Sequence, residues 1–420
     1  MSKFCFFPHS QSSPIVDHLL EAGCIPFVKT NVPQSLLSFE CGNPVWGKTL
    51  HPKKKEFTCG GSSGGEAALL ALNGSPLGIG SDVGGSLRIP SHFCGIYSLK
   101  PSYGRISTGP YKTYREGQES VKAVAGPMAR SVKDLELFMR SCVNKCDPSI
   151  LPMPFVSKSK KVKLKIAYAT KMSFVPTSPA CERAVLIAVS SVKKQGHKVF
   201  EFVIPDYIDE LLVLMYGFLS ADGGKGLINM LSGEPIEKVL ESSILSLKLT
   251  RLERKILSFF ISDPKLHSIL MAMRGKSADE LWQLQSRRTE LTRKFHEHWM
   301  SYGDFDCLIF PAGALPAIKH DTFDQLSFAA SYTFLWNLLD YSVGSIPVTC
   351  VDAEKDAWPS SFVAKDALSR ALHAHYDVKS MDGLDVGVQI VCQKYHEEQV
   401  LNCMEIIDSC LKNSSKLKAI

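Results

Sequence analysis

Two glycine-framed serine motifs, close together in the chain, constrain its fold and chemistry most. The first is GGSSGG at residues 60–65 and the second is VGGS at 83–86. Between them, residues 66–72 have the apolar spacing of a short helix, and residues 76–80 form an apolar run typical of a buried strand. Glycine gives the backbone conformations barred to other residues, so several amides can converge on one point and bind an anion. We predict that both serines meet in one anion-binding site, suited to phosphate or to the oxyanion of acyl transfer.

The plain alternative is that GGSSGG is a flexible linker. The motif opens directly into an apolar helix, however, and residues 81–105, SDVGGSLRIPSHFCGIYSLKPSYGR, resemble the signature block of a known family. This is the amidase signature family, serine hydrolases that cleave amides, and the resemblance is strongest to its fatty-acid amide hydrolase branch. It extends along the chain through TNVPQSLLSFECGNP, GPMARSVKDL, SADELWQLQ, SYTFLWNLLDYSVGSIPVT and GLDVGVQIV.

The resemblance implies an α/β fold with a central mixed β-sheet covered on both faces by helices. We expect one domain over residues 1–412, containing the signature block at 59–106, followed by a polar tail at 413–420. Asp147-Pro148 indicates a linker within the domain. From the residues alone, we predict strands at 24–28, 162–169 and 197–203 and helices at 16–22 and 180–196.

The resemblance also assigns catalytic roles. Ser86 matches the family's nucleophile, which forms the acyl ester, and Ser62 matches a serine on a cis peptide bond that relays the proton. Ser63 matches an auxiliary hydroxyl beside it. The amides of Val83, Gly84, Gly85 and Ser86 match the oxyanion hole. Asp82 and Arg88 are expected to form an ion pair that shapes this loop.

The third catalytic group of the family is a lysine in a VKD-like strand, farther upstream of the cis-serine than this chain extends. Lys29 matches a different position. We therefore expect a fold that is N-terminally incomplete and lacks the catalytic lysine. Because a serine hydroxyl is a poor nucleophile without a base, this predicts a chain that hydrolyses amides weakly or not at all.

Two further segments are expected to handle a lipid-like substrate. Residues 244–274 alternate apolar clusters with lysines and arginines, which suits either an amphipathic helix on the core or helices in a membrane interface. The resemblance favours the second, a membrane-binding cap beside the substrate entrance. Residues 331–337 resemble the wall of an acyl channel, although a helix rich in Tyr, Phe and Trp is also typical of plain core. Leu36 matches a position next to bound substrate.

Composition narrows the remaining possibilities. Thirteen cysteines without paired spacing favour buried thiols over a disulfide framework, and no metal site or cofactor is expected. The net charge of +6 is spread along the chain, so nucleic acid is not an expected partner. GNPVWGKT at 42–49 fits a phosphate-loop pattern but lacks the required strand and helix around it.

Two functions follow from these observations. The first is a serine hydrolase of fatty-acid amides, cytoplasmic or peripheral on intracellular membranes, with a lipid amide as substrate and a homodimer as a permitted assembly. The alternative is a catalytically impaired relative or fragment that binds lipid-like ligands or partners. The sequence does not specify the preferred acyl chain or amine.

Overall fold

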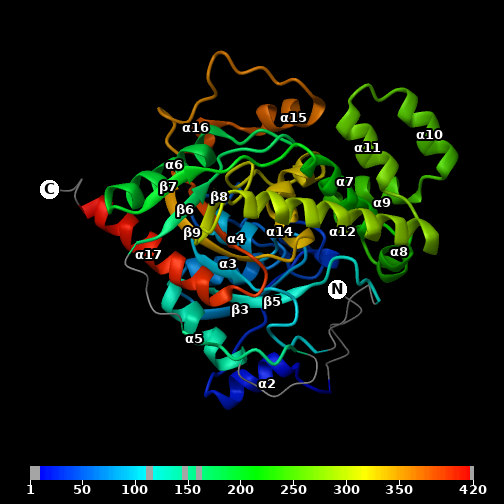
Figure 1. Cartoon of the computed structure of the whole chain (residues 1–420). Helices are drawn as coiled ribbons and strands as arrows, with labels where there is room; N and C mark the ends of the chain where they lie inside the picture. The colour runs from blue at the N-terminus through cyan, green and yellow to red at the C-terminus, as the bar shows by residue number, and fades with distance from the viewer. Residues whose placement is uncertain (1–9, 110–116, 144–149, 158–162, 417–420) are drawn as a thin grey trace.

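The computed structural model describes residues 10–109, 117–143, 150–157 and 163–416. Its centre is a mixed eight-stranded sheet in the order β3-β5-β4-β9-β10-β8-β6-β7 (Figure 1). The strands from β3 to β8 in this order pair antiparallel, and β6 pairs parallel with both β7 and β8. The strands are β3 Leu77–Asp82, β4 Tyr97–Lys100, β5 Val124–Ala129, β6 Lys165–Tyr168, β7 Lys198–Glu201, β8 Cys307–Pro311, β9 Ser342–Cys350 and β10 Asp385–Cys392.

Helices cover both faces of this sheet. Gln389 of β10 reaches Arg88 of α4 (Arg88–Cys94) and the backbone of α14 (Ser331–Leu338). Gly344 of β9 is the residue before Ser345, which pairs with Gln389, so Gly344 faces the other side of the sheet. There it lies against Met404 of α17 (Glu397–Lys416). The expected α/β fold is therefore confirmed.

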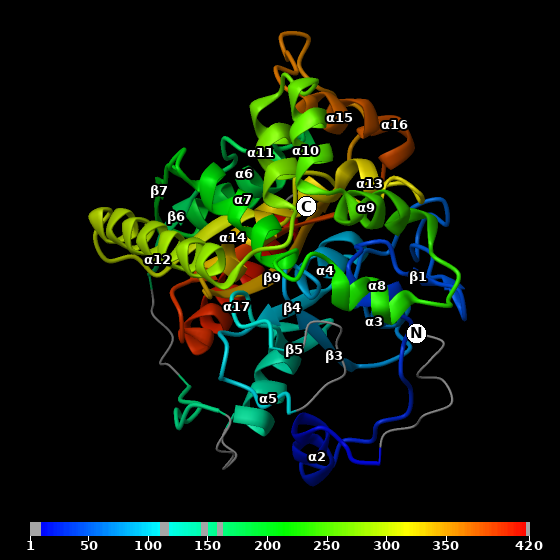
Figure 2. The same cartoon turned by 90° about the vertical axis from the view of Figure 1, so that its right-hand side faces the viewer.

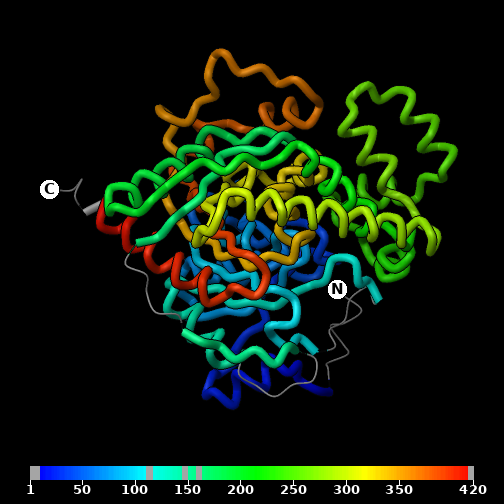
Figure 3. Tube along the Cα trace, viewed as in Figure 1, coloured from blue at the N-terminus to red at the C-terminus, as the bar shows by residue number. Residues whose placement is uncertain are grey.

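The remaining helices pack around this frame. In Figure 3 the C-terminal helix α17 lies beside α6 and α5, which it also contacts. Besides α4, α14 and α17, the helices of the fold are α2 Pro14–Glu21, α3 Gly64–Ala71, α5 Val132–Val143, α6 Pro179–Lys194, α7 Ile208–Leu219, α8 Lys225–Leu231, α9 Lys238–Lys248, α10 Arg251–Phe259, α11 Pro264–Ala272, α12 Ala278–Ser301 and α15 Ala367–His375. Short helical turns are η1 Gln34–Leu36, α13 Phe323–Leu326, η2 Ser327–Ala330 and α16 Val378–Met381.

Helices α10 and α11 form a hairpin that projects from the body of the molecule (Figures 1 and 2). Both helices begin at good caps. Thr250 closes a capping box with Glu253, and the Asp263 carboxylate accepts from the amides of Lys265 and Leu266. We call residues 251–272 the α10–α11 hairpin.

Most predicted elements match observed ones to within a few residues, and the strand predicted at 24–28 is wrong. Residues 24–28 have no regular structure, and Ile25 and Phe27 are 85% and 64% exposed. No strand in the described part of the chain pairs with this segment, so its apolar pattern has no ladder to join.

Two predicted boundaries can also be compared with the structure. The domain limit at 412 falls inside α17, which continues to Lys416, so the first residues of the expected tail at 413–420 are helical. The linker predicted at Asp147-Pro148 lies outside the described residues.

The phosphate-loop pattern at 42–49 forms a small antiparallel pair, β1 Gly42–Asn43 and β2 Gly47–Lys48, with no helix after it. Lys48 is bound by Glu40 and Asp321. No disulfide joins the cysteines in the described part of the chain, and all of these cysteines but Cys24 and Cys350 are buried.

Candidate active site

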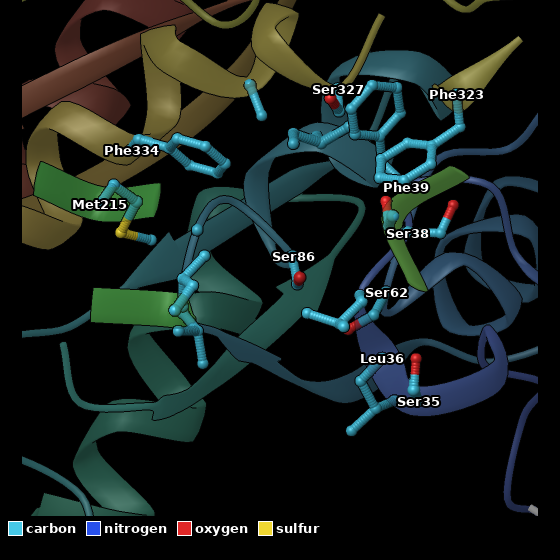
Figure 4. A pocket seen from close by; sticks show the side chains of 18 of the residues that line it. Ser35, Leu36, Ser38, Phe39, Ser62, Ser86, Met215, Phe323, Ser327 and Phe334 are labelled. Atoms are coloured by element: carbon cyan, nitrogen blue, oxygen red, sulfur yellow. The ribbon is translucent and has the colours of Figure 1, made fainter. Parts of the chain in front are cut away.

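The two glycine-framed loops meet at the start of α3. The backbone amide of Ser63 donates to the carbonyl oxygen of Ser86 over 3.2 Å. The side chains of Ser62 and Ser86 line one cavity and lie close to each other at its centre in Figure 4. The structure therefore brings the two predicted serines together. No hydrogen bond joins their hydroxyls among the contacts of the described residues.

The first loop is closely held. The Gly61–Ser62 peptide bond is cis, and Ser62 is 3% exposed. The hydroxyl of Ser63 lies 3.2 Å from the amide nitrogen and 3.4 Å from the carbonyl oxygen of Ser81 in β3. Ser63 thus ties the start of α3 to the sheet as well as lining the cavity.

The second loop is shaped by a buried ion pair. Arg88 binds both carboxylate oxygens of Asp82 at 3.0 Å, and both side chains are fully buried. Asn337 bonds to both of these side chains, and Gln389 accepts a hydrogen bond from Arg88. Burial raises the pKa of Asp82, but Arg88, Lys100 and Asn337 outweigh it and hold that pKa below its ordinary value.

The same carboxylate changes the expectation for the oxyanion hole. Asp82 accepts from the amides of Gly85 at 2.7 Å and Leu87 at 3.2 Å. The Gly85 amide is therefore engaged. Within the described residues, the amides of Val83, Gly84 and Ser86 have no hydrogen-bond partner.

Helix α14 buttresses this loop. The Thr333 hydroxyl donates to the carbonyl oxygen of Gly84 at 2.6 Å, and the Thr333 carbonyl accepts from Arg88. A side chain at Gly84 would strike the Phe334 ring at 2.6 Å. Gly85 has a φ of +122° and faces Thr333, so neither position admits another residue without strain.

The cavity has a volume of about 940 Å³ and a largely apolar wall. In Figure 4, Met215 and Phe334 stand on one side of the serines and Leu36 and Phe39 on the other. Its apolar lining further includes Ile15, Val32, Leu37, Ile79, Val121, Leu219, Leu247, Leu266, Ile269, Met273, Phe323 and Phe328. The volume is at the upper end of the range for small-molecule pockets, about 300–1,000 Å³.

Of the residues predicted to line the substrate channel, only some line the cavity. Leu36 lines the cavity and is 43% exposed, and its φ of +61° follows one of +63° at Ser35. Of residues 331–337, only Phe334 lines the cavity, because Tyr332 and Trp336 point into the core of the fold.

The described residues that line the cavity include no lysine, arginine or histidine. Glu66 is the acidic side chain on the Ser62 side. It accepts from Thr30 at 2.7 Å, and burial, partly offset by its bonds to Thr30 and to the backbone at Ile79, raises its pKa. Asp324 also lines the cavity, so the described wall offers carboxylates but no cation.

Two buried bases elsewhere do not reach the cavity wall. Burial lowers the pKa of Lys100 to about 8, and its ammonium donates to the Pro101 carbonyl. Burial likewise lowers the pKa of His92 to about 4, and its ring bonds to the backbone of Leu315 and Gly387. Both bind backbone within the core.

Sequence reasoning missed Thr333, Met215 and Phe39 as parts of the site. Thr333 lies in a segment singled out as channel wall, yet it acts on the backbone of the serine loop. Met215 lies in the apolar helix α7, where no sequence signal separates a cavity residue from a core residue.

Comparison with known proteins agrees with this geometry. The family model "Amidase" matches residues 2–401. The chain is 34% identical to "Fatty-acid amide hydrolase 1" of Sus scrofa, over 94% of this chain and 69% of that protein. It is 31% identical to "Acetamidase" of Emericella nidulans, over 96% of this chain and 71% of that protein.

Among solved structures, one described as "Fatty acid amide hydrolase" superposes with a TM-score of 0.84 at 29% identity, covering 98% of this chain and 69% of that one. The family match spans nearly the whole chain and includes both serine loops. This chain belongs to the amidase signature family of amide hydrolases.

Proposed function

We propose that this chain is a hydrolase of fatty-acid amides in which Ser86 is the nucleophile. Its oxygen attacks the amide carbonyl carbon, and the amides of Val83, Gly84 and Ser86 stabilise the developing oxyanion. Ser62 takes the proton from Ser86 and passes it to the nitrogen as the carbon–nitrogen bond breaks. Water then attacks the acyl ester on Ser86, which releases the fatty acid.

The convergence of Ser62, Ser86 and unpartnered backbone amides in one cavity is the observation that carries this proposal. The described wall offers Ser62 no basic side chain. General-base catalysis contributes about 10²–10⁴-fold, so we expect this 420-residue chain to acylate slowly. The alternative function, a catalytically impaired relative that binds lipid-like ligands, uses the same cavity without turnover.

A long acyl chain is favoured over a short one by the wall of the cavity. The acetamidase relative is nearly as similar in sequence as the fatty-acid amide hydrolase, so similarity alone does not separate the substrate classes. Each methylene of a substrate that is buried contributes about 0.8 kcal/mol to the binding free energy. The cavity offers an apolar wall for such burial, which includes Leu36 and Met273.

A series of primary amides with two to ten carbons tests this preference. Binding to a Ser86→Ala variant, followed as ligand-induced thermal stabilisation, should tighten about fourfold per added methylene. Turnover by the unsubstituted chain, measured as released acid, separates a slow hydrolase from a binding protein. Equal binding of acetamide and decanamide would exclude the fatty-acid assignment.

We further propose that the α10–α11 hairpin rests on a membrane beside the cavity entrance. Phe259 and Phe260 at its tip are 80% and 83% exposed, whereas Leu266 and Ile269 in its second helix line the cavity. The hairpin would thus give a lipid substrate a short apolar path from the membrane into the cavity. In the part of the chain that the structure describes, no helix has the length and apolar content needed to span a bilayer.

A further inference from the structure

A cysteine and a lysine meet on the outside of the molecule, where β9 ends and β10 begins. Cys350 is the last residue of β9 and pairs with Asp385, the first residue of β10, so their side chains lie on the same face of the sheet. The Cys350 Sγ lies 3.6 Å from Asp385 Oδ1, and the Lys53 Nζ lies 2.6 Å from the same oxygen. Lys53 Nζ is 3.9 Å from Cys350 Sγ. We call these three residues the thiol–amine cluster.

The surrounding structure holds the members of the thiol–amine cluster in place. His51 is buried, and its Nδ1 accepts from the backbone amide of Lys53 at 3.1 Å. The Asp385 carboxylate packs against Gly95, the left-handed cap of α4, where an added Cβ would meet its Cγ at 2.5 Å. The amine of Lys53 and the thiol of Cys350 are therefore kept close to each other, which favours a reaction between them.

Both reactive groups are open to solvent. Among the described cysteines, Cys350 is exposed, Cys24 is half-buried and the others are buried. The side chain of Lys53 is 48% exposed. Oxidation of a thiol depends on its exposure as well as on its thiolate character. Burial and Asp385 raise the pKa of Cys350 against the opposing charge of Lys53, so exposure rather than acidity distinguishes this thiol.

We propose that Cys350 and Lys53 form a reversible sulfur–nitrogen cross-link when hydrogen peroxide oxidises the thiol. The Cys350 sulfur attacks one peroxide oxygen, the oxygen–oxygen bond breaks, and the departing hydroxide takes the thiol proton, which leaves a sulfenic acid and water. The Lys53 nitrogen then attacks this sulfur, and the sulfenic hydroxyl leaves as a second water with a proton from the amine. The sulfur loses two electrons and the peroxide gains them.

The cross-link would connect two distant parts of the chain. Lys53 lies in the loop that leads into GGSSGG at 60–65, and Cys350 follows 297 positions later. A bond between residues so far apart restricts the unfolded chain, so the oxidised protein should unfold about 5 °C higher. A thiol attacking the cross-linked sulfur would reverse this effect. Neither residue lines the cavity, so the cross-link is independent of the proposed hydrolysis.

Peptide mapping by mass spectrometry, on the 420-residue chain treated with hydrogen peroxide at pH 9, tests this proposal. Burial lowers the pKa of Lys53, but Asp385 outweighs it and raises that pKa, so an alkaline pH frees more of the amine. We expect peptides joined through Cys350 and Lys53 with the loss of two hydrogen atoms, and separated again by dithiothreitol. Lys53→Arg keeps the charge beside Asp385 but removes the amine, so both the link and the rise in unfolding temperature should disappear.

Lys54→Arg and Cys24→Ser are the matched controls. The Lys54 ammonium donates to the Ser380 carbonyl instead, so both variants should keep the link and the thermal shift. Cys350 recovered from the unsubstituted chain only as a thiol, a sulfinic acid or a disulfide between two molecules would overturn the proposal. So would an oxidised Lys53→Arg variant that shows the same reversible rise in unfolding temperature.

Discussion

Buried polar residues around Asp82 hold the serine loop in place. One carboxylate binds Arg88, Asn337 and two loop amides, so the position of Ser86 depends on side chains from α4 and α14. Breaking a buried pair by removing one partner costs about 3–5 kcal/mol. A gentler change is needed to separate positioning from folding.

Thr333→Val provides that change. It removes the hydroxyl that donates to Gly84 but keeps the volume, and it should lower the free energy of unfolding by about 1–3 kcal/mol. It should also slow acylation of Ser86 by a fluorophosphonate about tenfold or more, because small displacements of reacting groups are costly. Ser331→Ala is the control, since the buried Ser331 hydroxyl has no partner in the described part of the chain. Equal rates in the two variants would contradict a positioning role for Thr333.

His92 gives a pH dependence of known sign. Its pKa is about 4 in the fold, lowered by burial, against about 6.5 in an unfolded chain. Between these values the unfolded chain binds a proton that the folded chain does not, so stability falls as the pH falls from 6.5 towards 4.

Urea unfolding at pH 7 and pH 5 measures this effect. From pH 7 to pH 5, the free energy of unfolding should fall by about 2 kcal/mol less in the His92→Gln variant than in the unsubstituted chain. The exposed His296, replaced by Gln, should leave the step unchanged. An identical pH dependence in the His92 variant would show that its imidazole is not held neutral.

At the scale of elements, α10 is an unusual helix because its apolar stripe faces outward and its buried face holds an arginine. The residues at 244–274 suited either packing on the core or a membrane interface, and the family resemblance favoured the membrane interface. An amphipathic pattern gives the spacing of the apolar residues but not which side of the helix packs on the core. In α10 the packed side is the one that carries Arg254, which donates to the carbonyl oxygens of Leu270 and Ser246.

Phe259→Asp/Phe260→Asp should abolish binding to phosphatidylcholine vesicles without changing the thermal unfolding midpoint, because both rings are exposed. Leu137→Asp, at an exposed apolar position of α5, is the control and should bind like the unsubstituted chain. Unchanged flotation of the Phe259/Phe260 variant would contradict the membrane role of the hairpin.

For the whole molecule, the family resemblance and local periodicity predicted the mixed sheet, its covering helices and the meeting of the two serine loops. The predicted strand at 24–28 failed because strand formation depends on a partner that periodicity cannot reveal. Long-range contacts such as Thr333 with Gly84 were equally hidden, since they join residues 249 positions apart. The bond between the Gly85 amide and Asp82, which separates Gly85 from its neighbours at 83–86, was equally absent from the sequence pattern.

The central claim is that Ser86, served by Ser62, is the acyl-accepting residue of this cavity. Incubation with a long-chain fluorophosphonate at pH 9, followed by mass-spectrometric mapping, tests it most directly. The account predicts a label on Ser86, none in Ser86→Ala, and slower labelling in Ser62→Ala than in the unsubstituted chain. A label on another residue, or equal labelling of the Ser62 variant, would contradict it.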